Sequence, residues 1–221
     1  DMCHYLEIIE ETESKKTYTN EMSSEEVKKA IANLPRFSLI TFTGGEAFMK
    51  NDFMDILEFA TRKHKVHIIT NGTTLSEKVV EDLMRLRLKS VWGSGLFYMG
   101  VSLEGEEALH DQITTVPGSF KKTTQGLERL VARRKELNSK FPLIHLTCVI
   151  NRGNARQLVP LYEYANKLEV NVANYVLSSP ATYWHGKDYD QDDHLQRPTA
   201  LVEEIEPELL RQQLDLLLEK S

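Results

Sequence analysis

The chain is poor in cysteine and contains no long apolar run. Its 221 residues include two cysteines, Cys3 and Cys148, too far apart in sequence for the closely spaced framework of a small disulfide-stabilised domain. A reducing compartment is therefore expected, and we predict a cytoplasmic location. No run approaches the roughly 20 apolar residues that a helix needs to cross a bilayer, so no membrane partner is expected.

Clustered positive charge is also scarce. The chain carries 27 Lys and Arg against 33 Asp and Glu, a net charge of −6, which argues against nucleic acid as a partner. It opens on Asp1-Met2-Cys3, without an initiator Met or a signal-peptide pattern, and is expected to be a fragment or the ordered part of a longer chain. Its length and its 41% apolar residues suit one globular core.

Short β-rich segments alternate with amphipathic helical segments, a pattern typical of parallel strands joined by crossover helices. Strands are expected at 37–43, 66–70, 98–103, 143–150 and 170–177, with a loop insertion at 90–97. Helices are expected at 24–34 (capped by Ser23 or Ser24), 120–137 (capped by Ser119), 155–168 and 207–220, with two more capped at Asn51 or Asp52 and at Ser76.

Glycines and polar residues follow the expected strands. The first strand leads into Gly44-Gly45-Glu46, which brings backbone close to a ligand and aims one carboxylate at it. A turn with a helix-capping Glu is the simpler interpretation of this triplet. Ligands bind at the carboxyl ends of the strands in α/β barrels, so we expect the residues after each strand to share one site. The later strands end in Thr70-Asn71-Gly72, Ser102-Leu103-Glu104-Gly105 and Asn151-Arg152-Gly153-Asn154.

Together these motifs resemble the radical S-adenosylmethionine (radical SAM) superfamily, in the branch of the molybdenum-cofactor cyclase and the peptide maturases. The resemblance runs from residue 1 to about 178 and includes residues 102–105, His110-Asp111 and the helix opening at 116–120. The sequence departs from the family pattern in two ways. Ala47 replaces the usual Pro after Gly-Gly-Glu, and of the cluster motif C-x3-C-x-aromatic-C only the last cysteine is present, as Cys3, with Met2 in the aromatic position. Truncation within the cluster loop is therefore expected.

The resemblance implies an α/β fold, an open (βα)6 partial TIM-type barrel with parallel strands, whose first strand would precede Asp1. It implies an enzyme with a [4Fe-4S] cluster and S-adenosylmethionine as cofactors. In that family three cysteines hold the cluster, and the open iron binds the amino and carboxylate groups of S-adenosylmethionine before reductive cleavage gives a 5′-deoxyadenosyl radical. The implied partners are an electron donor such as flavodoxin or ferredoxin and an unidentified peptide or small-molecule substrate.

The resemblance also assigns site residues. Cys3 is the expected metal ligand, and no catalytic residue is assigned. Simpler interpretations stay open: an Asn-Gly turn for Thr70 and Asn71, a plain strand-end residue for Ser102, and a helix N-cap rather than an adenosine contact for Asn154. Cys148, in mid-strand, is expected to be a buried inert thiol. The residues expected to bind S-adenosylmethionine are Met2, Gly44, Gly45, Glu46, Thr70, Ser102, Asn151 and Leu177.

Two units are expected along the chain. Residues 1–178 would form the radical SAM core, and residues 179–221 a polar loop with a C-terminal amphipathic helix packing on that core. Two other functions stay open: a barrel enzyme without a cluster, or inactive remnant, that uses Gly44 and Gly45 for a phosphate-type ligand, and a non-catalytic binding module. The residues encoded before Asp1 would discriminate between these three functions, because the motif C-x3-C ending directly before Asp1 favours the radical SAM hypothesis.

Overall fold

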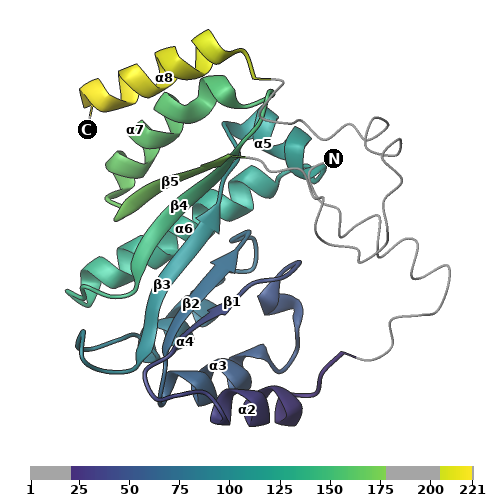
Figure 1. Cartoon of the computed structure of the whole chain (residues 1–221), viewed down its shortest axis with the longest axis vertical. Coiled ribbons are helices and arrows are strands. Elements are labelled where there is room, and N and C mark those ends of the chain that lie inside the picture. Colours follow the sequence, from purple (N-terminus) through teal and green to yellow (C-terminus); the bar gives the residue numbers. More distant parts are fainter. Residues whose placement is uncertain (1–20, 178–204, 221) are drawn as a thin grey trace, which may run out of the picture.

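A five-stranded parallel sheet organises the protein (Figure 1). The structure is a computed structural model that describes residues 21–177 and 205–220. The strands are hydrogen-bonded in chain order, and every neighbouring pair is parallel. They are β1 (Leu39–Phe42), β2 (Lys65–Thr70), β3 (Gly95–Ser102), β4 (Leu143–Ile150) and β5 (Val172–Leu177). The predicted α/β fold with parallel strands is confirmed, and the strand expected before Asp1 lies outside the described residues.

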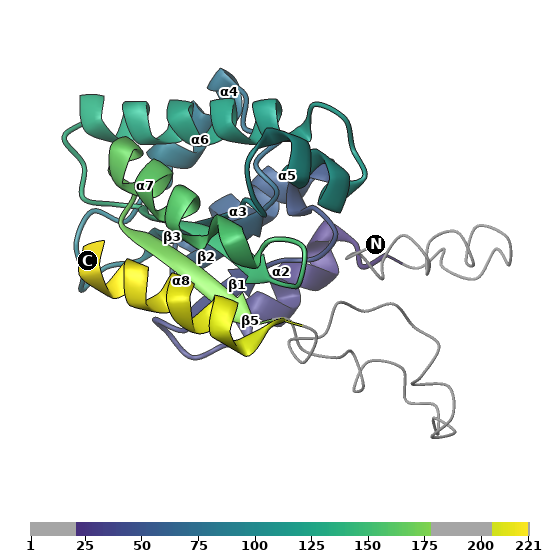
Figure 2. The ribbon, with the colours of Figure 1, turned by 90° about the horizontal axis from the view of Figure 1, so that it is seen from above.

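Helices connect successive strands, and α3, α4, α6 and α7 lie on one side of the sheet (Figure 2). Helix α2 packs on α3, and α8 packs on α7. The helices are α2 (Ser24–Ala32), α3 (Phe53–Thr61), α4 (Glu77–Arg85), α5 (Glu107–Thr114), α6 (Ser119–Glu136), α7 (Leu158–Leu168) and α8 (Pro207–Lys220). Short 3-10 helices, η1 (Ala47–Met49) and η2 (Ala155–Gln157), follow β1 and β4.

Alternation along the strands decides which side chains meet the helices. In β2, Val66, Ile68 and Thr70 are buried, whereas Lys65 and His67 point to the other face and are only partly buried. β4 alternates in the same way over its whole length. A period of two is what a pleated strand requires. The buried residues join the apolar faces of α3, α4 and α6, so the core lies between the sheet and these helices.

Four of the five strands begin at other residues than predicted. β2 begins at Lys65 instead of residue 66, and β5 begins at Val172 instead of residue 170. The sequence predicts the first strand from residue 37, but Phe37 has a φ of +67° and β1 begins at Leu39. It predicts the third from residue 98, after a loop at 90–97, but β3 begins at Gly95. Gly95 has a φ of +140°, and a Cβ there would lie 2.8 Å from the backbone of Leu88. The strand thus begins where glycine allows two backbones to approach closely, which residue alternation does not reveal.

Helix starts agree with the prediction at Ser23, at Asp52 before α3 and at Ser76 before α4, and differ at α6. Ser23 Oγ accepts from the backbone N of Glu26 at 3.3 Å, and the Glu26 carboxylate accepts from Ser23 N at 2.8 Å, which is a capping box. The predicted cap of α6, Ser119, is its first helical residue, and the N-cap is Gly118 with a φ of +76°. Asn154, a candidate cap for the next helix, makes no capping hydrogen bond.

Helix α5 is absent from the sequence prediction, because it is short and His110 is its one buried residue, so it shows no apolar periodicity. The neighbouring Asp111 takes over the capping of α6. Its carboxylate accepts from the backbone N of Gly118 at 2.5 Å and of Phe120 at 2.8 Å, and from the hydroxyl of Ser119 at 2.9 Å. The two backbone bonds hold the pKa of Asp111 below its usual value.

The C-terminal helix α8 extends the core at the β5 side. Leu209, Leu210 and Leu217 pack with Ile150 and Leu158 in a second apolar cluster. Residues 178–204 lie outside the described part, so the division of the chain near residue 178 stays a prediction. Within residues 21–177 and 205–220, no helix is both long and apolar enough to span a membrane.

Gly126, inside α6, is expected not to tolerate alanine. A Cβ there would lie 2.4 Å from the carbonyl oxygen of Gly72 and 2.9 Å from the Cβ of Leu75. Alanine favours a helix over glycine by about 1 kcal/mol, but overpacking costs about 1–3 kcal/mol. We expect Gly126→Ala to lower the free energy of unfolding in urea by about 1–2 kcal/mol. Gln125→Ala, on the exposed side of α6, is the control and should be neutral; equal stability of both variants would contradict the close contact.

Candidate functional site

The carboxyl ends of the strands lie along one edge of the sheet. Thr70, Ser102 and Leu177 are the last residues of β2, β3 and β5. Asn151 directly follows β4, and Glu46 follows β1 within four residues. Because all five strands are parallel, these residues come from five neighbouring strands at the same edge, as the motifs predict.

Glu46 links the ends of β1 and β2. Its carboxylate accepts from Thr70 Oγ1, which lies 2.9 Å from each oxygen, and from the backbone N of Asn71 at 2.8 Å. It also accepts from Phe48 N at 3.2 Å as the N-cap of η1, so the local capping role exists beside the cross-strand one. A carboxylate has capacity for several donors at once, and a cationic group is the strongest of them.

Gly44 and Gly45 border open space beside this carboxylate. A Cβ built on either would meet no heavy atom within 4 Å, and Gly44 has a φ of +149°, which other residues rarely adopt. Packing among the described residues therefore does not account for Gly45. Bare backbone next to a firmly held carboxylate fits a ligand with a cationic amino group, which S-adenosylmethionine has.

The other predicted site residues divide into accessible and buried ones. Ser102 is partly exposed, and 51% of Leu177 is exposed. Thr70 and Asn151 are only 3% and 6% exposed. The hydroxyl of Thr70 also accepts from the backbone N of Gly72 at 3.0 Å, and the carboxamide oxygen of Asn151 accepts from Gly153 N at 2.8 Å. Thr70 and Asn151 are thus buried beneath the surface at the carboxyl ends of the strands. Their side chains hold the backbone of the turns that follow β2 and β4.

Asn154 connects the segments that follow β3 and β4. It is fully buried, and its Nδ2 donates to the carbonyl oxygens of Glu104 at 3.0 Å and Val149 at 2.9 Å. Its Oδ1 accepts from the backbone N of Asn151 at 2.8 Å. Asn154 does occupy the N-cap position of η2, but its side chain makes no capping hydrogen bond. As a fully buried residue it offers no surface for the adenosine contact that the sequence also left open. From inside the protein, Asn154 holds together the segments that follow β3 and β4 at the carboxyl ends of the strands.

Glu104 is a buried carboxyl just beyond Ser102. Its Oε2 accepts from the backbone N of Val149 at 2.9 Å, and its own N donates to His110 Nδ1 at 3.1 Å. Burial raises the pKa of Glu104 to about 7, and the opposing hydrogen bonds from Val149 and Cys148 do not offset it. The Glu104 carboxyl, near the candidate site, therefore changes its charge close to neutral pH.

The expected cluster ligand Cys3, and Met2 beside it, lie outside the described residues. Within the described ranges 21–177 and 205–220, no group of three or more His, Cys, Asp or Glu is placed to hold a metal ion. Cys148 is fully buried in β4, and burial, with Glu104 beside it, raises the pKa of its thiol far above the usual value. The predicted burial of this thiol is confirmed, and Cys148 does not fit a cluster.

Comparison with known proteins identifies the family. The model of the Radical SAM superfamily matches residues 1–165. Fe-coproporphyrin III synthase from Methanosarcina barkeri (strain Fusaro / DSM 804) is 30% identical over 149 residues, which are 66% of this chain and 34% of that protein. Mycofactocin maturase MftC from Mycolicibacterium smegmatis is 27% identical over 141 residues, or 62% and 32% of the two chains. The chain spans about a third of the length of these curated relatives, both of which are enzymes.

Solved structures share the fold. Streptococcus suis SuiB bound to precursor peptide SuiA aligns with a TM-score of 0.56 at 17% identity, covering 82% of this chain and 35% of that one. Native anSMEcpe with bound AdoMet and Kp18Cys peptide aligns with a TM-score of 0.54 at 18% identity, covering 76% and 45%. At such identity the likeness shows the fold alone. The family model, in contrast, covers most of the sequence, and on that basis the chain belongs to the radical SAM superfamily.

Proposed function

We propose that this chain carries the core of a radical SAM enzyme that binds S-adenosylmethionine along the carboxyl edge of the sheet. The observation that carries this proposal is the Glu46 carboxylate, held by Thr70 and Asn71 beside two glycines that border open space. Its negative charge suits the amino group of S-adenosylmethionine through a charge-assisted hydrogen bond. Ser102 would offer a hydroxyl to the carboxylate or ribose, and Leu177 an apolar surface to the adenine.

The proposed metal group is a [4Fe-4S] cluster with Cys3 as one of its three thiolate ligands. We place the other two before Asp1, as the family motif implies. When bound, the cluster and S-adenosylmethionine supply the reductive cleavage that starts radical chemistry, with an electron from a donor such as flavodoxin or ferredoxin. The residues of this chain orient the cofactor and keep its amino group in place.

For the substrate we propose a peptide or a small molecule that lies beside this edge. Among the relatives, MftC and the Sporulation killing factor maturation protein SkfB from Bacillus subtilis (strain 168), 29% identical over 153 residues, are named as maturation proteins. Others are named as synthases of Fe-coproporphyrin III and heme. These names support both substrate classes.

Anaerobic reconstitution of the full-length gene product with iron and sulfide tests the proposal. We expect a brown protein with about four irons per chain, which converts S-adenosylmethionine to 5′-deoxyadenosine and methionine when dithionite is added. Cys3→Ala should abolish both the colour and the product, because the cluster loses a ligand. Cys148→Ala is the matched control and should retain both. A wild-type protein that stays colourless and forms no 5′-deoxyadenosine would refute the proposed function.

A further inference from the structure

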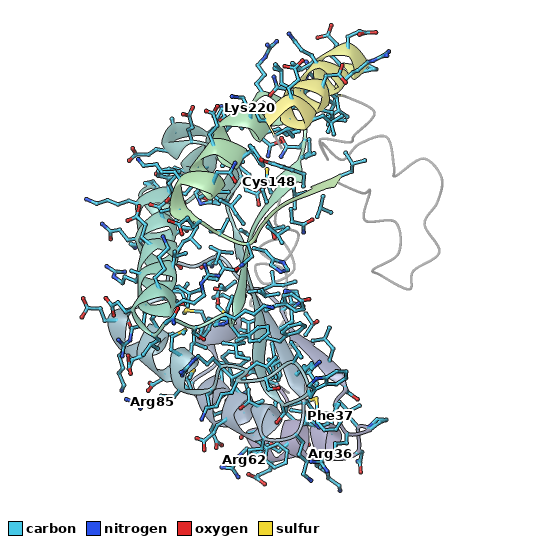
Figure 3. All side chains as sticks on the ribbon, turned by 90° about the vertical axis from the view of Figure 1, so that its left-hand side faces the viewer. Arg36, Phe37, Arg62, Arg85, Cys148 and Lys220 are labelled. Carbon is cyan, nitrogen blue, oxygen red and sulfur yellow. The ribbon has the colours of Figure 1, made fainter. Side chains whose placement is uncertain are left out.

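The sheet face turned away from the helices carries a cluster of polar rings. Side chains alternate along the strands, so Lys65 and His67 of β2 and His145 of β4 lie on this face, opposite the buried core residues. We call it the open face and define its central cluster as Lys65, His67, Tyr98 and His145. The side view in Figure 3 shows the sheet between the helices and the open face.

The three rings of the cluster are in mutual contact. The centroids of His67 and Tyr98 lie 5.7 Å apart, those of Tyr98 and His145 4.9 Å, and those of the two histidines 5.8 Å. A register shift between β2 and β3 brings Tyr98 opposite His67. Gly100, two residues further along β3, leaves the strand bare beneath the histidines, and a Cβ there would already lie 3.5 Å from Nε2 of His67. The backbone of β3 thus makes room for the rings.

The charged and basic side chains that the strands place on the open face are all of the cationic type. None of the five strands contains Asp or Glu, although the chain as a whole has a net charge of −6. The titratable side chains that the strands place on the open face are Lys65, His67, Tyr98 and His145; β1 contributes Thr41 and β5 Asn174. Lys65 Nζ lies over the ring of Phe97, 5.3 Å from its centroid. As far as residues 21–177 and 205–220 show, this face carries basic groups and no acidic ones, which makes it complementary to an anion.

Both histidines have an unsatisfied ring nitrogen. Among the described residues, Nε2 of His67 and Nε2 of His145 are buried and have no hydrogen-bond partner. Nδ1 of His67 faces Thr41 Oγ1 at 3.4 Å, which is a long contact. Desolvation lowers the pKa of both rings, and a charge on His145 lowers that of His67 further. Two neutral imidazoles with orphaned nitrogens form a costly arrangement unless a ligand completes it.

We propose that the cluster of Lys65, His67, Tyr98 and His145 is a substrate subsite that binds a carboxylate group. This inference rests on the proposed function, because it places the substrate on the open face of the strands whose carboxyl ends would hold S-adenosylmethionine. Of these ends, Thr70 lies three residues further along β2 than His67. An anion that lies against the cluster favours the protonated forms of the histidines, and Lys65 and the hydroxyl of Tyr98 add a positive charge and a hydrogen-bond donor. Affinity for the carboxylate therefore rises as the pH falls through the range of the histidines.

Nuclear magnetic resonance of protein labelled at histidine Cε1 tests this subsite. One probe is a capped peptide of glutamates, with the glutamine peptide as its neutral match. The other is coproporphyrin III, with its tetramethyl ester as the neutral match. We expect the His67 and His145 signals to move with at least one acidic probe and with neither neutral one, while the buried His64 and His110 stay unchanged. His67→Asn and His145→Asn assign the signals.

A pair of lysine variants separates this subsite from general charge attraction. Lys65→Met should weaken binding of the acidic probe about fivefold or more. Lys63→Met removes the same charge from an exposed position two residues away and should leave the affinity unchanged. Thermal melting confirms that both variants fold. Equal losses in the two variants, shifts with the neutral probes, or no shift with either acidic probe would overturn the proposal.

The outcomes are distinct from those of the cofactor tests, because neither the cluster nor S-adenosylmethionine is present in the titration. Carboxylate binding at these histidines without 5′-deoxyadenosine production would refute the proposed function and leave the subsite standing. Production of 5′-deoxyadenosine without carboxylate binding would refute the subsite and leave the proposed function standing. The acidic probe that moves the signals shows whether a peptide or a small tetrapyrrole provides the carboxylate.

Discussion

Glu46→Ala is expected to weaken the binding of S-adenosylmethionine to the cluster-loaded protein by roughly 10- to 100-fold, since a hydrogen bond to a charged group contributes about 1.5–3 kcal/mol. The change removes the proposed partner of the amino group. It also leaves the hydroxyl of Thr70 and the backbone N of Asn71 without their carboxylate acceptor. Titration calorimetry under anaerobic conditions measures the loss directly.

Two further variants distinguish the effect of the Glu46 charge from the effect of the hydrogen bonds that hold its carboxylate. Thr70→Val keeps the charge and the shape but removes one hydrogen bond to the carboxylate, so its affinity should fall only about threefold to tenfold. Met49→Ala, at the exposed end of η1, should have no effect. An unchanged affinity in Glu46→Ala would show that the cofactor does not bind at this edge.

Glu104→Gln is expected to remove a large part of the pH dependence of stability. The pKa of Glu104 is raised from 4.5 to about 7 in the folded protein, so the native state binds more protons than the unfolded chain between these values. Its contribution to stability is fully present below the unfolded pKa and is lost as the pH rises through about 7. At 1.36 kcal/mol per unit of pKa, the loss amounts to about 3 kcal/mol by pH 8.5.

The glutamine variant should therefore be less sensitive to pH and more stable than the wild type above pH 8, by about 1–3 kcal/mol. Its amide oxygen can still accept the bond from Val149. Urea unfolding at several pH values between 5 and 8.5 gives the two profiles. Glu107→Gln, an exposed neighbour in α5, should keep the wild-type slope. Parallel profiles for the wild type and Glu104→Gln would refute a proton-linked role of Glu104.

The sequence predicts the parallel sheet well, because each strand and every helix connecting two strands except α5 leaves a local pattern. β4 at Leu143–Ile150 and α8 at Pro207–Lys220 have the predicted bounds. Where a boundary depends on a distant neighbour, the prediction fails: β3 begins at Gly95 because the backbone of Leu88 lies against it. Helix α5 was missed because its buried face consists of His110, which carries no apolar signal.

The candidate site is predictable at the level of motifs but not of contacts. Glycines and polar residues after strands indicate Glu46 and Ser102 from sequence alone. The partners of Glu46 come from 24 and 25 residues away, and Asn154 reaches the carbonyl of Glu104, 50 residues away. Such pairs exist only once the strands align. The histidines of the open face had one usable signal, their position on the alternate, unburied face of β2 and β4.

The hydrogen bonds of Asn154 have a consequence for how a ligand would bind. Because one side chain joins the carbonyls of Glu104 and Val149 to the backbone of Asn151, the segments after β3 and β4 behave as one body. Their conformational freedom is lost when the chain folds, and not when a ligand arrives. Preorganisation of this kind leaves more of the contact energy for affinity, since ordering flexible groups at a binding site opposes binding.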